Sequence, residues 1–154
     1  MDELIQRFYA AFNEHDGDTM AACYAPDAHF WDPVFQDLTG VEAGQMWRML
    51  TGRAADLRVE LAEHAADGET GSAHWIAHYT FTQTGRPVVN DIRATFGFKD
   101  GLIADHRDEF DFTKWARQAI GLPGLLPPVR SAVRKKARAG LDEYIAGRAG
   151  TTSA

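Results

Sequence analysis

The sequence predicts an α+β domain in which three helices precede a curved sheet. Apolar residues recur at helical spacing over roughly the first fifty positions, and they alternate with polar residues between positions 57 and 110. Turn residues separate the alternating runs. The length of 154 residues, with 45% hydrophobic and 25% charged residues, suits one globular domain with its own core.

Three helices and a short strand are predicted for the N-terminal part. Helical spacing of apolar residues predicts a first helix that ends near His15. A second helix runs from an N-cap at Asp18 to Tyr24. A strand over residues 28–32 stops at a proline, which cannot donate to a ladder, and a third helix covers about residues 41–50.

The second half of the chain predicts an antiparallel meander. Its four strands are separated by Asp-Gly, Thr-Gly-Arg-Pro and Lys-Asp-Gly turns, and they cover residues 57–66, 72–82, 88–98 and 102–110. A short helix over residues 111–120 closes this domain, which spans residues 1–120.

The C-terminal segment differs in composition from the domain before it. A linker rich in proline and glycine (121–128) leads to a basic amphipathic helix (129–146) and a disordered tail (147–154). From Gly121 onward there are six basic and two acidic residues, in a chain whose net charge is -6. We favour packing of this helix on its own acidic domain or on a partner subunit; a lid over a ligand cavity and an anionic membrane contact are the alternatives.

Composition also excludes several classes of protein. The net charge of -6 argues against nucleic-acid binding. The single cysteine, Cys23, excludes an internal disulfide and a multi-thiolate metal cluster. An acidic N-terminus and the lack of a long apolar run predict a cytoplasmic protein.

Several motifs resemble the nuclear-transport-factor-2-like (NTF2-like) superfamily, over roughly residues 3–120. The resemblance lies in Tyr-Ala-Pro-Asp-Ala-His-Phe-Trp-Asp-Pro at 24–33, Gly40, Trp47, and the strings at 84–87, 96–103 and 106–111. The superfamily includes ketosteroid isomerases, limonene-type epoxide hydrolases and polyketide cyclases. The resemblance implies a cone, in which a bent sheet wraps around the helices and its hollow end holds a small apolar ligand. It also implies a homodimer formed through the outer face of the sheet.

Period-two alternation assigns one face of each strand to the hollow. The inward faces are rich in aromatic residues, as expected of a ligand pocket. The predicted ligand-binding residues are Tyr9, Phe12, Trp47, Trp75, Tyr79, Asn90, Ala94, Phe96 and Phe110.

Three ionisable residues are the predicted catalytic groups. Asp32 stands where the family's isomerases keep their catalytic base, and an apolar cavity would raise its pKa; the alternative is a turn-capping Asp before Pro33. Asp108 matches a catalytic acid of the limonene-type hydrolases and shares a strand face with His106, so the two form a candidate acid–base pair. The alternatives for this pair are a buried polar pair that only shapes the cavity, or two metal ligands; no metal is expected, because no second inward histidine is predicted.

The chain also departs from the family pattern. Ala94 stands where the isomerases have a protonated aspartate, and Phe8 or Ala10 stands at their tyrosine. The donors that stabilise an enolate are therefore not carried over, although His106 or Tyr79 could replace them. The Asp and Arg of the limonene-type hydrolases are likewise missing from the strand at 72–82.

We therefore expect a cofactor-free enzyme that uses carboxylate and histidine acid–base chemistry on an apolar ketone, polyketide or steroid-like substrate, as an isomerase or cyclase. The alternatives are a non-catalytic ligand-binding or dimeric assembly module and, further, an epoxide hydrolase.

Overall fold

The computed structural model describes residues 1–151, so residues 152–154 of the predicted tail lie outside the described part. The helices are α1 (Asp2–Asn13), α2 (Gly17–Ala22), α3 (Gly40–Arg53), α4 (Phe112–Ala119), the 3-10 helix η1 (Leu122–Leu125) and α5 (Pro127–Thr151). The strands are β1 (Tyr24–Trp31), β2 (Leu38–Thr39), β3 (Arg58–Ala66), β4 (Thr70–Phe81), β5 (Arg86–Lys99) and β6 (Leu102–Glu109).

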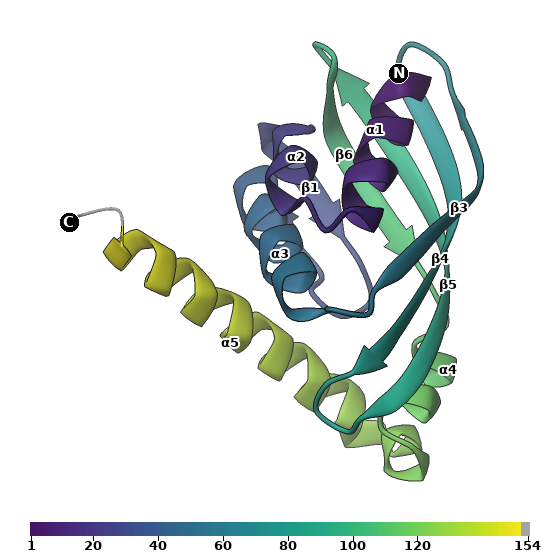
Figure 1. Cartoon of the computed structure of the whole chain (residues 1–154), viewed down its shortest axis with the longest axis vertical. Helices are drawn as coiled ribbons and strands as arrows, with labels where there is room; N and C mark the ends of the chain where they lie inside the picture. Colours follow the sequence, from purple (N-terminus) through teal and green to yellow (C-terminus); the bar gives the residue numbers. More distant parts are fainter. Residues whose placement is uncertain (152–154) are drawn as a thin grey trace.

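The strands form one sheet with the order β2-β1-β6-β5-β4-β3. β1 runs parallel to β6, with Phe30 opposite His106, and all other neighbours are antiparallel. The sheet curves past α1, with α2 and α3 beside it (Figure 1). The predicted α+β fold, a bent mixed sheet with three N-terminal helices and an added C-terminal helix, is confirmed.

Side-chain caps mark the starts of three helices. Thr39 and Glu42 form a reciprocal capping box at the start of α3, and Asp111 caps α4. The predicted cap of α2 is wrong by two residues, because Asp16 accepts from the backbone N–H of Thr19. Asp18 instead pairs with the guanidinium of Arg48, at 2.5 Å.

The start of β1 also differs from the prediction. The strand begins at Tyr24, although residues 25–27 read as a break. Tyr24 lies opposite Ile103 of β6, and the backbone N–H of Ile103 donates to the carbonyl of Cys23 at 2.8 Å. The register then shifts before His29, so that Pro26 is tolerated in this irregular stretch.

The core has two parts. The main cluster lies between α1, α3 and the sheet and includes Ile5, Phe8, Phe30 and Met46. A smaller cluster lies at the other end, where α4 packs on β5 through buried residues that include Val88, Phe112, Trp115, Ala116 and Ala119.

The C-terminal segment is more ordered than the sequence indicates. The predicted linker contains η1, and α5 starts at Pro127 and continues through Thr151, so the predicted disorder is wrong for residues 147–151. Leu141 of α5 is fully buried in the main core, and Arg138 pairs with Glu42 of α3 at 2.6 Å. The helix therefore packs on its own domain, as Figure 1 shows.

Candidate functional site

A chain of buried hydrogen bonds links side chains of α3, β1, β6 and β4. The indole N–H of Trp47 donates to the hydroxyl oxygen of Tyr24 at 2.9 Å. The Tyr24 hydroxyl lies 2.5 Å from Nδ1 of His106, whose Nε2 lies 3.1 Å from the carboxylate of Asp108. The indole N–H of Trp75 also donates to Asp108, at 3.3 Å.

His106 is the central member of this chain. Its two ring nitrogens can each donate or accept, and they bridge the Tyr24 hydroxyl and the Asp108 carboxyl. Both ring nitrogens of His106 are thus used within the protein. His106 is 0% exposed and Asp108 is 3% exposed, so the pair lies out of contact with solvent.

Asp32 is both a turn cap and a buried acid, the two roles that the sequence leaves open. Its Oδ1 accepts from the backbone N–H groups of Val34 (2.8 Å) and Phe35 (2.5 Å), which makes it a turn cap. Burial nevertheless raises its pKa to about 6, and the charge of Asp108 adds to the rise. Both bonds end on Oδ1, so Oδ2 is left for other partners.

Two tyrosines bring hydroxyl groups to the same interior. The buried hydroxyl of Tyr9 has no hydrogen-bond partner among the described residues. Its pKa is raised by burial and by the nearby charges of Asp108 and Tyr24. The hydroxyl of Tyr79 accepts from Trp115 at 2.8 Å, and its pKa is raised by burial and by the charge of Asp32.

The predicted ligand-binding residues fall into two groups. Six are buried and pack on one another in the main core, with ring centroids 5.0 Å apart for Phe12 and Trp47 and 5.6 Å apart for Tyr9 and Trp75. These are Tyr9, Phe12, Trp47, Trp75, Ala94 and Phe96. The other three are only partly buried: Tyr79, Asn90 and Phe110.

Helix α5 covers the loop that carries Asp32. Arg134 donates from Nε to the carbonyl of Pro33 at 3.0 Å. Val133 packs on the smaller apolar cluster, as do Val34 and Tyr79. Side chains of α5 therefore pack against the loop beside Asp32.

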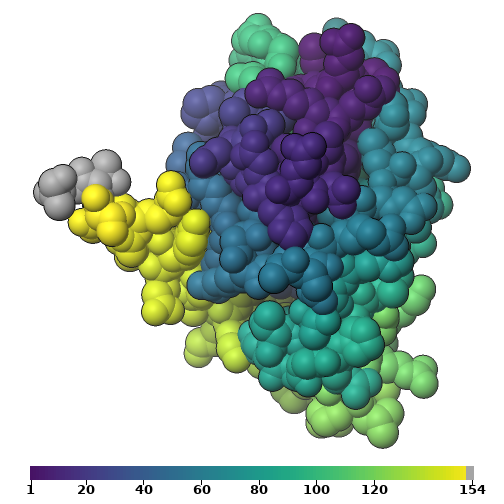
Figure 2. All heavy atoms as spheres, in the orientation of Figure 1, coloured from purple at the N-terminus to yellow at the C-terminus, as the bar shows by residue number. Residues whose placement is uncertain are grey.

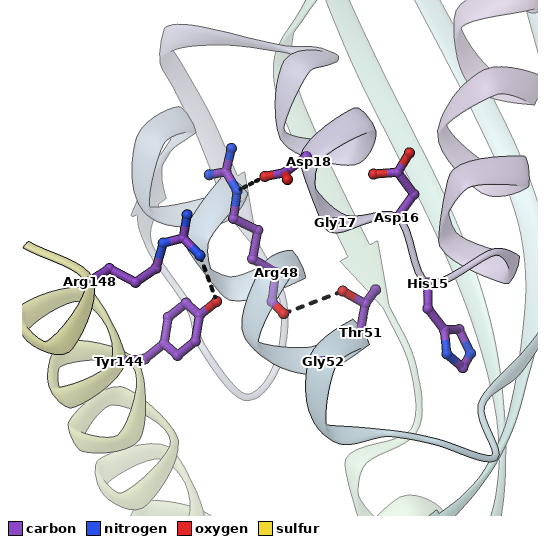
Figure 3. A pocket seen from close by; sticks show the side chains of 9 residues that line it. All are labelled: His15, Asp16, Gly17, Asp18, Arg48, Thr51, Gly52, Tyr144 and Arg148. Carbon is purple, nitrogen blue, oxygen red and sulfur yellow. Dashed lines mark hydrogen bonds and ion pairs between the residues drawn. The ribbon is translucent and has the colours of Figure 1, made fainter. Parts of the chain in front are cut away.

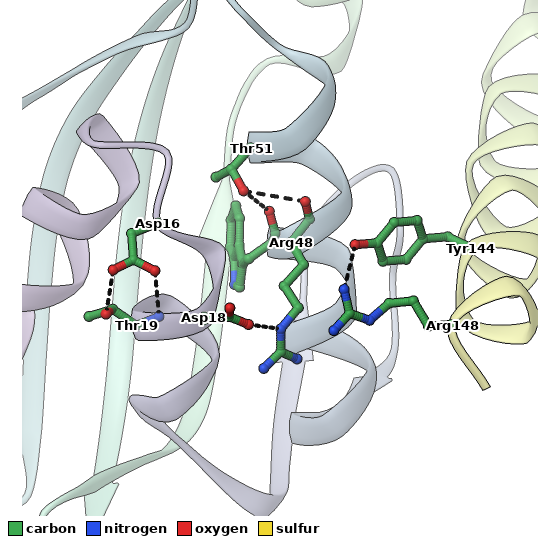
Figure 4. Close-up of polar contacts among 8 residues, drawn as sticks. Asp16, Asp18, Thr19, Arg48, Thr51, Tyr144 and Arg148 are labelled. Atoms are coloured by element: carbon green, nitrogen blue, oxygen red, sulfur yellow. Dashed lines mark hydrogen bonds and ion pairs between the residues drawn. The ribbon is translucent and has the colours of Figure 1, made fainter. Parts of the chain in front are cut away.

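Two surface hollows lie apart from the predicted ligand-binding residues. One, of about 230 Å³, lies between the α1–α2 turn, the end of α3 and α5, and includes His15, Asp18, Arg48, Thr51 and Arg148 (Figure 3). Its polar groups bond locally, because Arg48 pairs with Asp18, Thr51 donates to the Trp47 carbonyl, and Arg148 donates to Tyr144 (Figure 4). The other, of about 250 Å³, lies between α2, α3 and β1. None of the nine predicted ligand-binding residues lines either hollow.

The described residues also bear on the predicted metal, membrane and dimer contacts. Within residues 1–151, no three His, Cys, Asp or Glu side chains gather as metal ligands would, and no helix combines the length and apolarity needed to cross a membrane. On the outer face of the sheet, His74 bonds to Asp91 at 2.9 Å, and Nε2 of His78 is buried without a partner in the described residues. The homodimer through this face stays a prediction.

The bent sheet packed around N-terminal helices is the fold of the NTF2-like proteins. Within them, this chain belongs to the SnoaL-like family, because the model of the SnoaL-like domain matches residues 5–106. No curated protein matches the chain.

Solved structures confirm the fold. A protein with a ketosteroid isomerase-like fold from Catenulispora acidiphila DSM 44928, in complex with trimethylamine, matches with TM-score 0.68 and 16% identity over 82% of this chain and 98% of that chain. A candidate polyketide cyclase from Xanthomonas campestris pv. campestris matches with TM-score 0.63 and 24% identity, over 75% and 93%. An epoxide hydrolase of the limonene type from M. tuberculosis matches with TM-score 0.65 and 22% identity, over 82% and 95%. At these identities the likeness concerns the fold alone.

Sequence reasoning missed Tyr24 as a partner of the site. The residue reads as the end of a helix, and its contact with His106, 82 positions away, depends on the parallel pairing of β1 with β6. No local pattern in the sequence predicts that pairing.

Proposed function

We propose that this chain is a cofactor-free acid–base enzyme, of isomerase or cyclase type, for a small and mainly apolar ketone, polyketide or steroid-like molecule. The observation that carries the proposal is the hydrogen-bonded line from Tyr24 through His106 to Asp108, with the Asp32 carboxyl close enough to Asp108 for their charges to interact. Clusters of buried ionisable groups of this kind concentrate at functional sites.

The groups suit a reaction through an enolate. Near pH 7 Asp32 is mostly ionised, and its Oδ2 takes a proton from the carbon beside the substrate carbonyl. The electron pair moves to the carbonyl oxygen. Asp32 then returns the proton to another carbon in an isomerisation. In a cyclisation the enolate carbon attacks a second carbonyl of the substrate, and the alkoxide that forms takes the proton back from Asp32.

The Tyr9 hydroxyl supplies a donor for the developing oxyanion. A buried hydroxyl without a partner costs about 1–3 kcal/mol, which a ligand oxygen would recover. Tyr24 and Asp108 hold the His106 ring in one orientation through bonds to its two nitrogens.

A non-catalytic ligand-binding module is the second candidate. The close packing of Phe12, Trp47 and Trp75 in the main core favours it, because these rings fill space that a substrate would need. Epoxide hydrolysis is not proposed, because β4 lacks the Asp and Arg that hold the water in the limonene-type hydrolases.

Deuterium exchange of ketone α-protons, followed by NMR, tests the proposal without knowledge of the product. A panel of cyclic enones and aromatic polyketide-like ketones is screened first for a thermal shift, and binders are incubated with protein in D₂O. We expect exchange that falls at least about 100-fold in D32N and is unchanged in D27N, an exposed aspartate of β1, the strand that ends just before Asp32. Equal exchange in D32N would contradict the proposal, and binding without exchange of any ketone would favour the second candidate.

A further inference from the structure

The turn between α4 and α5 exposes three leucines. Leu122, Leu125 and Leu126 are 75%, 44% and 58% exposed. Exposed apolar groups gathered within a few residues mark contact surfaces, whereas single ones are ordinary. In residues 1–151, the other large apolar residues that are exposed stand far apart in the sequence: Met1, Val41 and Val89.

The leucines project because the turn is held firmly. Gly124 is buried against α4, where a Cβ atom would lie 2.5 Å from the carbonyl oxygen of Ala116. Prolines at 123, 127 and 128 restrict the backbone on both sides. The fold therefore presses the backbone of η1 onto α4 and leaves its side chains outside.

The sequence on both sides of the leucines is strongly basic. Residues 112–141 contain seven Lys or Arg and no Asp or Glu, whereas the rest of the chain has 9 basic and 22 acidic residues. Of the seven, only Arg138 forms an ion pair with a carboxylate within residues 1–151. Lys114, Arg117 and Lys135 are exposed. Exposed basic side chains thus stand on α4 and at the start of α5, before and after the apolar turn in the sequence.

We propose that this tip, residues 112–136, docks on the surface of an anionic lipid bilayer. The leucines enter the acyl-chain region while the basic side chains meet lipid phosphates. Figures 1 and 2 show α4, η1 and the start of α5 together at one end of the molecule.

A bilayer fits this pair of features better than a second copy of the chain does. It offers an apolar layer directly beneath a negative one, whereas the acidic part of this protein exposes only isolated large apolar residues. The apolar stripe of α5 is already buried on its own domain through Leu141. The contact therefore involves the tip, which includes the first residues of α5, and leaves out the buried stripe around Leu141. It does not depend on the proposed chemistry.

Co-sedimentation of the full chain with vesicles tests the inference. The probes are vesicles of phosphatidylcholine alone and of phosphatidylcholine with about one third phosphatidylglycerol, at low and high salt. We expect binding to the anionic vesicles only, weakened at least about tenfold by 0.5 M salt and at least about tenfold in L122S/L125S/L126S. Circular dichroism and thermal melting show that each variant remains folded.

Two control variants separate the role of the tip from a general loss of apolar surface or of positive charge. V41S/V89S removes two exposed apolar residues elsewhere and leaves binding unchanged. K114Q/R117Q/K135Q weakens binding, whereas R7Q/R53Q/K99Q, which removes the same charge from exposed positions outside the tip, does not. Absence of binding to anionic vesicles, equal loss in both charge variants, or a leucine-dependent dimer in sedimentation velocity without vesicle binding would each overturn the proposal.

Discussion

Replacement of Asp32 by Asn makes protein stability depend on pH in a defined way. The carboxyl is held in a turn and partly buried, and burial raises its pKa from 3.8 to about 6. Asn keeps a carbonyl oxygen that can accept from the N–H groups of Val34 and Phe35, so the turn is preserved. The variant therefore removes mainly the ionisation.

The sign of the effect follows from proton binding. Between about pH 4 and pH 6 the folded protein holds the Asp32 proton more tightly than the unfolded chain, so this carboxyl makes the wild type less stable as the pH rises. At 1.36 kcal/mol per pKa unit, the shift corresponds to about 3 kcal/mol of lost stability above pH 6 and none below pH 4. The free energy of unfolding of D32N, relative to the wild type, should rise by up to that amount from pH 4 to pH 8.

Urea unfolding of both proteins at several pH values, followed by circular dichroism, measures this difference. Other carboxylates with lowered pKa values, such as Asp16 and Asp67, act in the opposite direction but cancel between wild type and variant. D27N, at an exposed site, should track the wild type throughout. A stability difference between D32N and wild type that stays constant with pH would refute the reasoning, because it would mean that the carboxyl titrates normally.

Two further predictions concern packing, and thermal or urea unfolding checks both. Gly40→Ala should destabilise the protein by at least about 1–3 kcal/mol, because the new Cβ would lie 2.0 Å from a carbonyl oxygen of β1, whereas Gly52→Ala, with nothing within 4 Å, should be neutral or stabilise by roughly 0.5–1 kcal/mol. Equal effects of the two changes would show that α3 can move away from β1. Leu141→Ala should cost about 2–5 kcal/mol because the side chain is fully buried, whereas Leu122→Ala should stay within about 0.5 kcal/mol; a small cost at Leu141 would mean that α5 detaches easily.

The strands and their faces could be predicted because period-two alternation is a strong signal. The inward assignment of Trp75, His106 and Asp108 agrees with their burial in the structure, although the register shifts within β3 and between β5 and β6. The prediction of the α2 cap failed because Asp16 and Asp18 are both suitable caps; in the structure Asp16 accepts from Thr19 and Asp18 pairs with Arg48. When two nearby residues can cap a helix equally well, the local sequence does not distinguish them.

The interior of the site could be predicted only in part. Alternation shows which aromatic side chains point inward, but not whether they leave a space, since packing depends on rotamers. The sequence also leaves open whether Asp32 is a turn cap or a buried acid, because both roles need an aspartate before the proline. In the structure Asp32 has both roles. The bond from Tyr24 to His106 needs the strand order of the whole sheet.

The parallel pairing of β1 with β6 has a consequence for how the protein forms during synthesis. β1 leaves the ribosome early, but its partner and the His106–Asp108 pair come about eighty residues later. Until then β1 has an unpaired edge, a template for aggregation, and loop closure over that distance is slow. A nascent or truncated chain that stops before Leu102 lacks both the partner strand and the acid–base pair, so fragments of this domain should require chaperones, whereas the full chain gains its complete sheet and its site in the same step.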